Sequence, residues 1–255
     1  MCELGNKWWM ENKVCYNGYI RNAYWGVSSL EYEIISGTFD TGTDEQQAGY
    51  VKLFGEEKVQ ERFELYFHWF NVVHEVGHIL VEQQKKRINP VEEELLVNQF
   101  TLAYWKHVGG DAELEVLKEV MTDAISKMPN PIPSKQTFTE YFKRIWGTAK
   151  LYTVEMYGYF QLSSVLHAMK QEKSLEEVLY ELGIEQMDLS MMEPVHMEPS
   201  AKNASQILSS CISNLHNAGI MMPSVRLELV KNPEVQCCQP VKERESKKVH
   251  RVGKG

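Results

Sequence analysis

The residues best suited to chemistry in this sequence are two histidines and the glutamate beside them, in the run HEVGH at residues 74–78. Positions i and i+4 of an α-helix are only about 40° apart around the axis, so His74 and His78 would leave one face of a helix. Two neutral imidazoles arranged in this way can bind the same Zn²⁺. Glu75 is too close in sequence to be a comfortable third ligand, but it is well placed to take a proton from a water molecule on the metal. The run therefore predicts one zinc ion per chain, with Glu75 as general base.

The residues around this run predict a buried helix. From about Glu57 to the basic residues 85–87, apolar side chains recur at steps of three and four, which is the period of a helix with one buried face. The stripe comprises Phe63, Tyr66, Phe67, Phe70, Val73, Gly77 and Leu80. A stripe of this kind usually belongs to the core, so we expect the histidines to lie inside the domain. Asn89 as N-cap and Pro90 as first helical residue predict the start of the next helix.

A third protein ligand must come from another part of the chain. The longer pattern H-E-x-x-H-x-x-G-x-x-H would need glycine at Val81 and histidine at Gln84, so it is absent. Downstream, Glu94 and Asn98 form E-x-x-x-N, which places both side chains on one helix face. Residues 92–94 are all glutamate, and an acidic first turn is also common in helices that bind no metal.

In these two segments, about residues 70–105, the chain resembles the gluzincin group of zinc metallopeptidases, which includes thermolysin. Members carry H-E-x-x-H on one helix and E-x-x-x-D, or a close variant, on the next. The resemblance implies that Glu94 is the third zinc ligand and that Asn98 orients a ligand histidine. Asn in place of Asp is a departure, because the amide oxygen still accepts a hydrogen bond from a histidine but adds no negative charge. The resemblance also implies that an extended peptide substrate binds along a sheet edge beside the zinc.

Related peptidases use a downstream tyrosine or histidine to stabilise the oxyanion of the transition state. The segment YGY at residues 157–159 makes Tyr157 and Tyr159 candidates for this role, with His167 as a lesser one. The simpler interpretation of each is an ordinary core aromatic residue with its polar atoms at the surface, and it is the more common one. His107, near the end of a predicted helix, is a weaker alternative as a metal ligand.

The whole sequence predicts an α+β fold that is mainly helical: a zincin-like metallopeptidase domain with a small N-terminal β-sheet. Residues 1–50 are rich in Trp, Tyr and Ile and should form a β region packed on the catalytic domain. Within it we expect a hairpin around Asn17-Gly18, a strand from Tyr32 to Phe39 and a polar loop over residues 37–49.

Residues 51–238 should form the helical zinc-peptidase domain. The proline-rich segment 129–133 cannot be helical and is a possible subdivision. We expect one long helix from Thr137 to about Lys170 and a short one over Leu175–Leu182. Residues 239–255 are basic and lack apolar content, so they are predicted to be a disordered tail.

Composition excludes some functions and suggests a compartment. The net charge of −8 argues against a general nucleic-acid binder. No stretch has the apolar length of a membrane span or of a signal peptide, so we expect neither membrane nor export. The five cysteines are odd in number and form no C-x-x-C, which fits a reducing cytoplasm. Cys237-Cys238 could form an accessory metal or redox site, but two free thiols is the simpler interpretation.

The function that these residues predict is zinc-dependent hydrolysis of peptide or amide bonds in a peptide or protein substrate. A first alternative is a non-catalytic module that kept the zinc-peptidase fold and binds a peptide or protein partner. A second is a chance H-E-x-x-H in a helical interaction protein without metal. The presence of Glu75 argues against the first alternative, since an inactive site has no need of its base. The sequence predicts no oligomeric state and no particular substrate.

Overall fold

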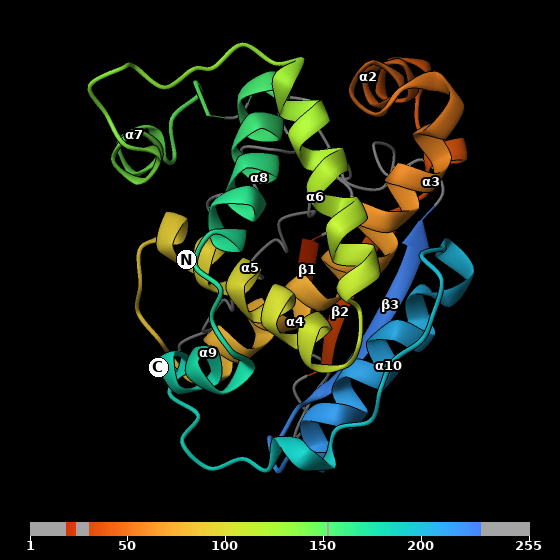
Figure 1. The fold of residues 1–255 in the computed structure, drawn as a ribbon, viewed down its shortest axis with the longest axis vertical. Helices are drawn as coiled ribbons and strands as arrows, with labels where there is room; N and C mark the ends of the chain where they lie inside the picture. Colours follow the sequence, from red (N-terminus) through yellow and green to blue (C-terminus); the bar gives the residue numbers. More distant parts are fainter. Residues whose placement is uncertain (1–18, 24–30, 152, 231–255) are drawn as a thin grey trace, which may run out of the picture.

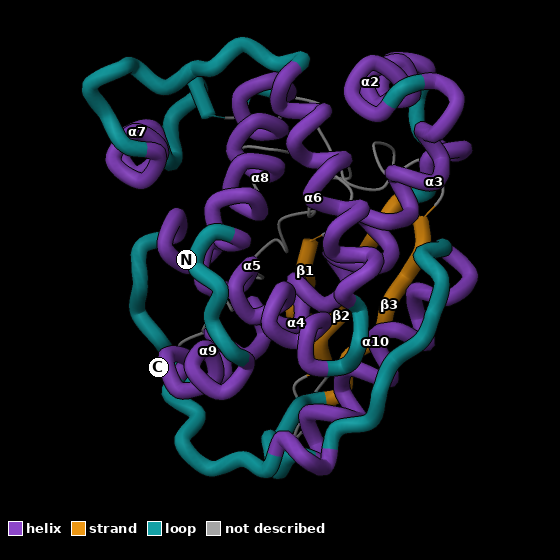
Figure 2. Tube along the Cα trace, in the orientation of Figure 1, coloured by secondary structure: helices purple, strands orange, loops and turns teal. Residues whose placement is uncertain are grey.

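The computed structural model of this chain describes residues 19–23, 31–151 and 153–230, and most of them are helical (Figures 1 and 2). The strands are β1 (Tyr19–Ala23), β2 (Glu31–Gly37) and β3 (Ser224–Val230). The α-helices are α2 (Asp44–Phe54), α3 (Val59–Phe63), α4 (Asn71–Gln83), α5 (Pro90–His107), α6 (Asp111–Ser126), α7 (Phe138–Ile145), α8 (Val154–Met169), α9 (Leu175–Leu182) and α10 (Ala201–Asn217). The expectation of a mainly helical α+β fold is confirmed.

The three strands form one sheet in the order β1-β2-β3. β1 is antiparallel to β2, and β2 is parallel to β3, so all the helices that the structure describes lie between two neighbouring parallel strands in the sequence. Tyr32, Ile34 and Ile35 of the central strand are buried, and α4 and α10 pack on the sheet (Figure 1). The strand expected from Tyr32 to Phe39 is confirmed as β2 up to Gly37, whereas Phe39 begins a short 3-10 helix. The turn expected at Asn17-Gly18 lies outside the described residues.

The helix α4 that carries both histidines packs closely on α5 because Gly77 has no side chain. A Cβ at this position would lie 2.7 Å from Val97 Cγ1 and 3.1 Å from Phe100 Cδ1. The first distance is too short for two carbon atoms, so any larger residue would push the helices apart. The glycine within the HEVGH run therefore sets the distance between the two helices that bear the predicted ligands.

Gly77→Ala should lower the free energy of unfolding by about 1–3 kcal/mol, the usual cost of overpacking a core. The loss should occur although alanine favours a helix over glycine by about 1 kcal/mol. Gly49→Ala in α2 is the matched control, because a Cβ there meets nothing within 4 Å, and it should be neutral or stabilising. Urea unfolding measures both. A Gly77→Ala protein as stable as the parent would contradict the close approach.

Local capping signals correctly predicted where several helices start and end. The Asn89 side chain accepts a hydrogen bond from the Val91 N–H at 3.0 Å, and Pro90 occupies the first position of α5. Ser174 and Glu177 form a capping box at the start of α9, which ends at Gly183 in the left-handed conformation.

Two expectations about the helices are wrong. The loop predicted over residues 37–49 contains the start of α2, where Thr43 and Gln46 form a capping box. The single helix predicted from Thr137 to Lys170 is two helices, α7 and α8. Gly147 between them adopts a φ of +75°, which glycine tolerates and a helix does not, and Thr153 caps the start of α8.

Elements on either side of two of the expected divisions, after residue 50 and at residues 129–133, pack together in this structure. The division after residue 50 falls inside α2, and the sheet joins strands from both sides of it. The segment 129–133 separates α6 from α7, but α7 packs back on α5 and shares a second core cluster with it. Residues 239–255 lie outside the described part. Within the described residues, no helix is both long enough and apolar enough to span a membrane.

Candidate metal centre

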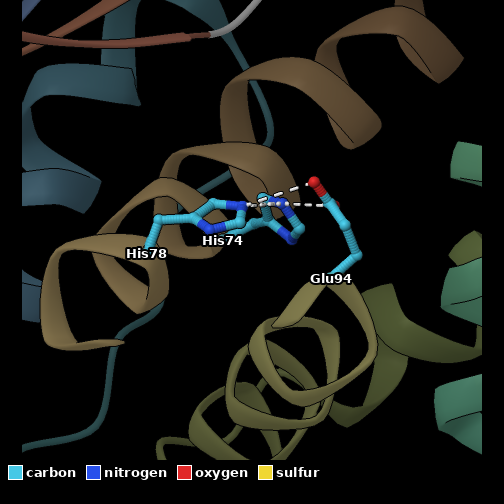
Figure 3. A group of neighbouring side chains, drawn as sticks. All are labelled: His74, His78 and Glu94. Atoms are coloured by element: carbon cyan, nitrogen blue, oxygen red, sulfur yellow. Dashed lines mark hydrogen bonds and ion pairs between the residues drawn. The ribbon is translucent and has the colours of Figure 1, made fainter. Parts of the chain in front are cut away.

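His74 and His78 of α4 and Glu94 of α5 converge on one point (Figure 3). The two Nε2 atoms are 3.1 Å apart. Glu94 Oε2 lies 3.5 Å from His74 Nε2, and Glu94 Oε1 lies 3.7 Å from His78 Nε2. Ligands placed tetrahedrally at zinc distances are about 3.3–3.5 Å apart. The three residues therefore have the spacing of three corners of a zinc tetrahedron.

Hydrogen bonds set the orientation of the His74 ring. The Ser164 hydroxyl of α8 donates to the carbonyl of Gln161 at 2.7 Å, so its oxygen accepts from Asn98 Nδ2 at 2.9 Å. This places the Asn98 amide oxygen against His74 Nδ1, at 3.0 Å. An amide oxygen only accepts, so Nδ1 carries the hydrogen and Nε2 presents its lone pair. Asn98 thus lies where the resemblance to gluzincins places the residue that orients a ligand histidine.

The ring of His78 is held by Glu93, a contact that the sequence analysis missed. Glu93 Oε1 lies 2.9 Å from His78 Nδ1 and accepts its hydrogen. The sequence offers Glu93 only as part of an acidic first turn, and no spacing rule links it to His78. Its neighbour Glu92 does face solvent, where it pairs with Lys143 of α7. The two imidazoles therefore have different partners, an amide and a carboxylate.

The donor set fits a divalent cation. With both Nδ1 hydrogens engaged, the two Nε2 atoms meet at 3.1 Å, an arrangement that is repulsive for two neutral rings unless a proton or a metal ion lies between them. Glu94 Oε2 is buried and accepts no hydrogen bond from any residue that the structure describes. A buried carboxylate oxygen without a partner is costly. Zn²⁺ at the point of convergence would remove both costs.

Charges around His78 determine its protonation state when no metal is bound. Burial lowers the pKa of His78, but the hydrogen bond to Glu93 and the charges of Glu94 and Glu75 outweigh it and raise the pKa to about 9. Burial raises the pKa of Glu94, yet its interactions with His74, His78 and Gln161 lower it overall. The site without metal therefore holds an ionised Glu94 and, at neutral pH, a proton on His78.

Zinc binding should release that proton, because zinc needs the neutral imidazole. The apparent zinc affinity should rise about tenfold per pH unit between pH 6.5 and 8 and level off above the His78 pKa of about 9. In the absence of metal, the raised pKa means that protonated His78 stabilises the fold fully below about pH 6.5, and that this contribution is lost as pH rises through 9. Calorimetry in buffers of different ionisation enthalpy counts the protons. Zinc binding at pH 7 without proton release would contradict this assignment.

Glu93→Gln should weaken zinc binding by roughly 10–100-fold, the usual effect of losing the partner of a ligand histidine. Glu92→Gln is the control, since it makes the same change on a neighbouring side chain that is 49% exposed. Competition with a chelator of known affinity measures both variants. Equal affinities for the two variants would show that the Glu93 contact does not orient His78.

Glu75 lies beside the three ligands without being one of them. Its side chain is buried, and the Asn71 amide donates to its Oε1 at 3.0 Å. The negative charge of Glu75 raises the pKa of His78 and of Tyr157, which shows that the carboxylate is close to both. A carboxylate held in this way is suited to exchange protons with a group at the metal.

The two tyrosines predicted as oxyanion donors are placed differently. Tyr157 is near the cluster, since burial and then the charge of Glu94 raise its pKa well above the usual value. Tyr159 lies about 200° around α8 from Tyr157 and donates to Asn130 Oδ1 at 3.2 Å, within the second core cluster. The structure therefore brings Tyr157, and not Tyr159, to the candidate centre.

The two other histidines considered as candidates have partners elsewhere. The ring of His167 stacks on Phe138, with 5.3 Å between the ring centroids. His107 Nε2 donates to the carbonyl of Leu189 at 3.0 Å. Among the described residues, His74, His78 and Glu94 are the group that could hold a metal ion.

The centre is nearly closed. The side chains of His74 and Glu94 are 5% and 12% exposed, and that of His78 is 19% exposed, so the described residues leave the cluster most open at His78. Comparison of the chain with protein-family models, with curated proteins and with solved structures finds no match.

Proposed function

We propose that this protein is a zinc-dependent hydrolase of peptide or amide bonds, with one Zn²⁺ held by His74, His78 and Glu94. The observation that carries the proposal is the convergence of two imidazole lone pairs and an unsatisfied carboxylate oxygen at zinc spacing. Structural zinc sites usually have four protein ligands, whereas catalytic sites have three and leave a position for water or substrate. Three ligands with a buried carboxylate beside them match the catalytic type.

Each residue of the centre has a role in this proposal. Zn²⁺ bound here would lower the pKa of a water molecule toward neutrality and polarise the carbonyl of the scissile bond. Glu75 takes the proton from the attacking water and later gives it to the leaving amine. Asn71 donates to one Glu75 oxygen, and the other accepts no hydrogen bond from the described part of the chain, so it is available for this exchange. The Tyr157 hydroxyl is a candidate donor to the oxyanion.

The resemblance to gluzincins supports the same function, since those enzymes place a glutamate ligand and its orienting partner on the helix after H-E-x-x-H. On this basis we further propose that the domain is zincin-like and that its substrate is a peptide or protein. The cytoplasmic location stays a prediction based on the cysteine pattern.

The burial of the centre favours one alternative, a zinc-containing module that binds a peptide or protein partner without cleaving it. Glu75 is only 6% exposed, and a substrate carbonyl must reach the metal beside it. The surface hollow beside Gln99 and Lys118 and the one beside Ile184 and Met221 do not include the cluster. Hydrolysis therefore requires the His78 side of the centre to admit a peptide.

One experiment tests the proposal against this alternative. Protein purified without added zinc is analysed for metal, stripped with a chelator, reloaded, and incubated with a mixed peptide library that is read by mass spectrometry. We expect one zinc per chain and cleavage that stops with the chelator and returns with zinc. Stoichiometric zinc with peptide retention and no cleavage favours the binding module. Absence of zinc from the protein contradicts both.

A further inference from the structure

A π-helical segment, Glu64–Phe70, leads directly into the helix that carries the histidines. Its hydrogen bonds include one from the N–H of Asn71 to the carbonyl of Tyr66, five residues back. π-Helical turns are rare, and they occur mostly as single-turn bulges that are frequent at functional sites. A segment of seven such residues changes which side chains share a face with the histidines.

The segment brings Tyr66 toward the face of His74. In a continuous α-helix, positions 66 and 74 would be about 80° apart around the axis. A π-helical turn contains roughly one residue more than an α-helical turn, so most of this offset is removed. The Tyr66 ring is held by Phe67 and Phe70, with centroid distances of 4.7 and 6.1 Å.

Buried polar contacts anchor the segment to the sheet. His68, a residue without exposed surface, donates from Nε2 to the carbonyl of Gly37 at the end of β2, at 2.9 Å. Its Nδ1 lies 2.5 Å from Glu64 Oε2, and Gln60 donates to the other oxygen of Glu64. Losing these contacts would leave buried polar groups unsatisfied, so they favour the backbone geometry that presents Tyr66.

Tyr66 has a free hydroxyl beside the candidate centre. The residue is 4% exposed, and its hydroxyl has no hydrogen-bond partner among the residues that the structure describes. Buried tyrosine hydroxyls usually find one. Burial, and then the nearby charges of Glu94 and Glu75, raise the pKa of Tyr66, so the hydroxyl stays protonated and can donate.

Tyr157 differs in this respect. Its hydroxyl also lies in the field of Glu94 and Glu75, but it already accepts a hydrogen bond from Gln161 Nε2 at 2.8 Å. Of the two tyrosines at the centre, Tyr66 is thus the one whose hydroxyl has no partner within the described part of the chain.

We infer that Tyr66 is a further catalytic residue of the proposed hydrolase, whose hydroxyl donates a hydrogen bond to the carbonyl oxygen of the scissile bond. The inference rests on the proposed function. The O–H bond of Tyr66 stays intact, because Glu75 carries the proton between water and leaving amine. A donor aimed at the developing oxyanion contributes most in the transition state, and its removal typically costs roughly 10²–10³-fold in kcat.

The test compares Tyr66→Phe with Tyr141→Phe in the zinc-loaded full chain. Tyr141 is also buried but lies in the second core cluster, where its hydroxyl donates to Met156 Sδ at 3.9 Å. The probe is acetohydroxamate, a small zinc ligand that carries a carbonyl oxygen and an anionic oxygen. Calorimetry measures its affinity, and chelator competition measures zinc affinity separately. We expect Tyr66→Phe to bind acetohydroxamate about tenfold more weakly with zinc affinity unchanged, and Tyr141→Phe to match the parent in both.

For any peptide that the parent cleaves, kcat of Tyr66→Phe should fall by roughly 10²–10³-fold with little change in KM. Equal acetohydroxamate affinity in Tyr66→Phe and the parent would remove Tyr66 from the mechanism and leave the proposed function intact. A loss of zinc affinity in Tyr66→Phe would make its role structural and also overturn the inference. A parent protein that binds no zinc, or that cleaves nothing, overturns the proposed function and this inference together. The behaviour of the parent therefore separates failure of the proposed function from failure of the Tyr66 inference alone.

Discussion

Glu75→Gln should leave one zinc bound per chain and slow peptide hydrolysis by roughly 10²–10⁴-fold, the usual cost of losing a general base. Glutamine has the size of glutamate and still accepts the hydrogen bond from Asn71, which glutamate receives at 3.0 Å. It cannot take a proton from water at neutral pH. Metal content and the rate on a peptide that the parent cleaves are measured on the same preparation.

Glu82→Gln is the matched control for this variant, because Glu82 lies on the same helix at an exposed position. It should cleave as fast as the parent. Full activity in Glu75→Gln would refute the assigned base. Loss of zinc in Glu75→Gln would instead indicate that Glu75 is a ligand, and the ligand set would need revision.

Removal of one of the three ligands should lower the zinc affinity more than any other substitution considered. His78→Ala should abolish stoichiometric zinc binding, and Glu94→Ala should weaken it by more than the roughly 10–100-fold expected for a partner residue such as Glu93. Each change leaves only two ligands, and Glu94→Ala also removes the negative charge next to both imidazoles. Chelator competition and metal analysis after dialysis measure the loss.

Two control variants accompany this prediction. Glu92→Ala should hold zinc almost as well as the parent, since Glu92 pairs with Lys143 at the surface. Cys237→Ser combined with Cys238→Ser should also keep the metal, because the ligands proposed here include no thiolate. Full zinc in His78→Ala together with loss in the double cysteine variant would show that the metal is bound elsewhere.

The elements that could be predicted from the sequence are those with short-range causes. The apolar stripe through Val73 and Leu80 predicts a buried helix, and Asn89-Pro90 predicts the start of the next one. Both expectations are confirmed, because helix period and helix capping depend on residues within one or two turns. The same local rule puts His74 and His78 on one face.

Two local signals conflict with the composition of the segments that contain them. Thr43 and Gln46 have the spacing of a capping box, yet the polar composition of residues 37–49 suggested a loop. Gly147 lies within a segment whose apolar residues otherwise predict one continuous helix. In both places composition outweighed a capping or breaking residue in the prediction, whereas in the folded chain those single residues define the ends of α2 and α7.

The composition of the centre depends on contacts between segments far apart in the chain, which no local pattern encodes. Glu93 meets His78 because α4 and α5 pack as closely as Gly77 permits, and the sequence alone offers Glu93 only as a surface residue. Ser164 reaches Asn98 from α8 across 66 positions of sequence. Tyr66 joins the face of the histidines through a π-helical register that a 3.6-residue period cannot reveal. The sequence thus identifies the residues with metal chemistry, and the packing of the helices determines which neighbours orient them.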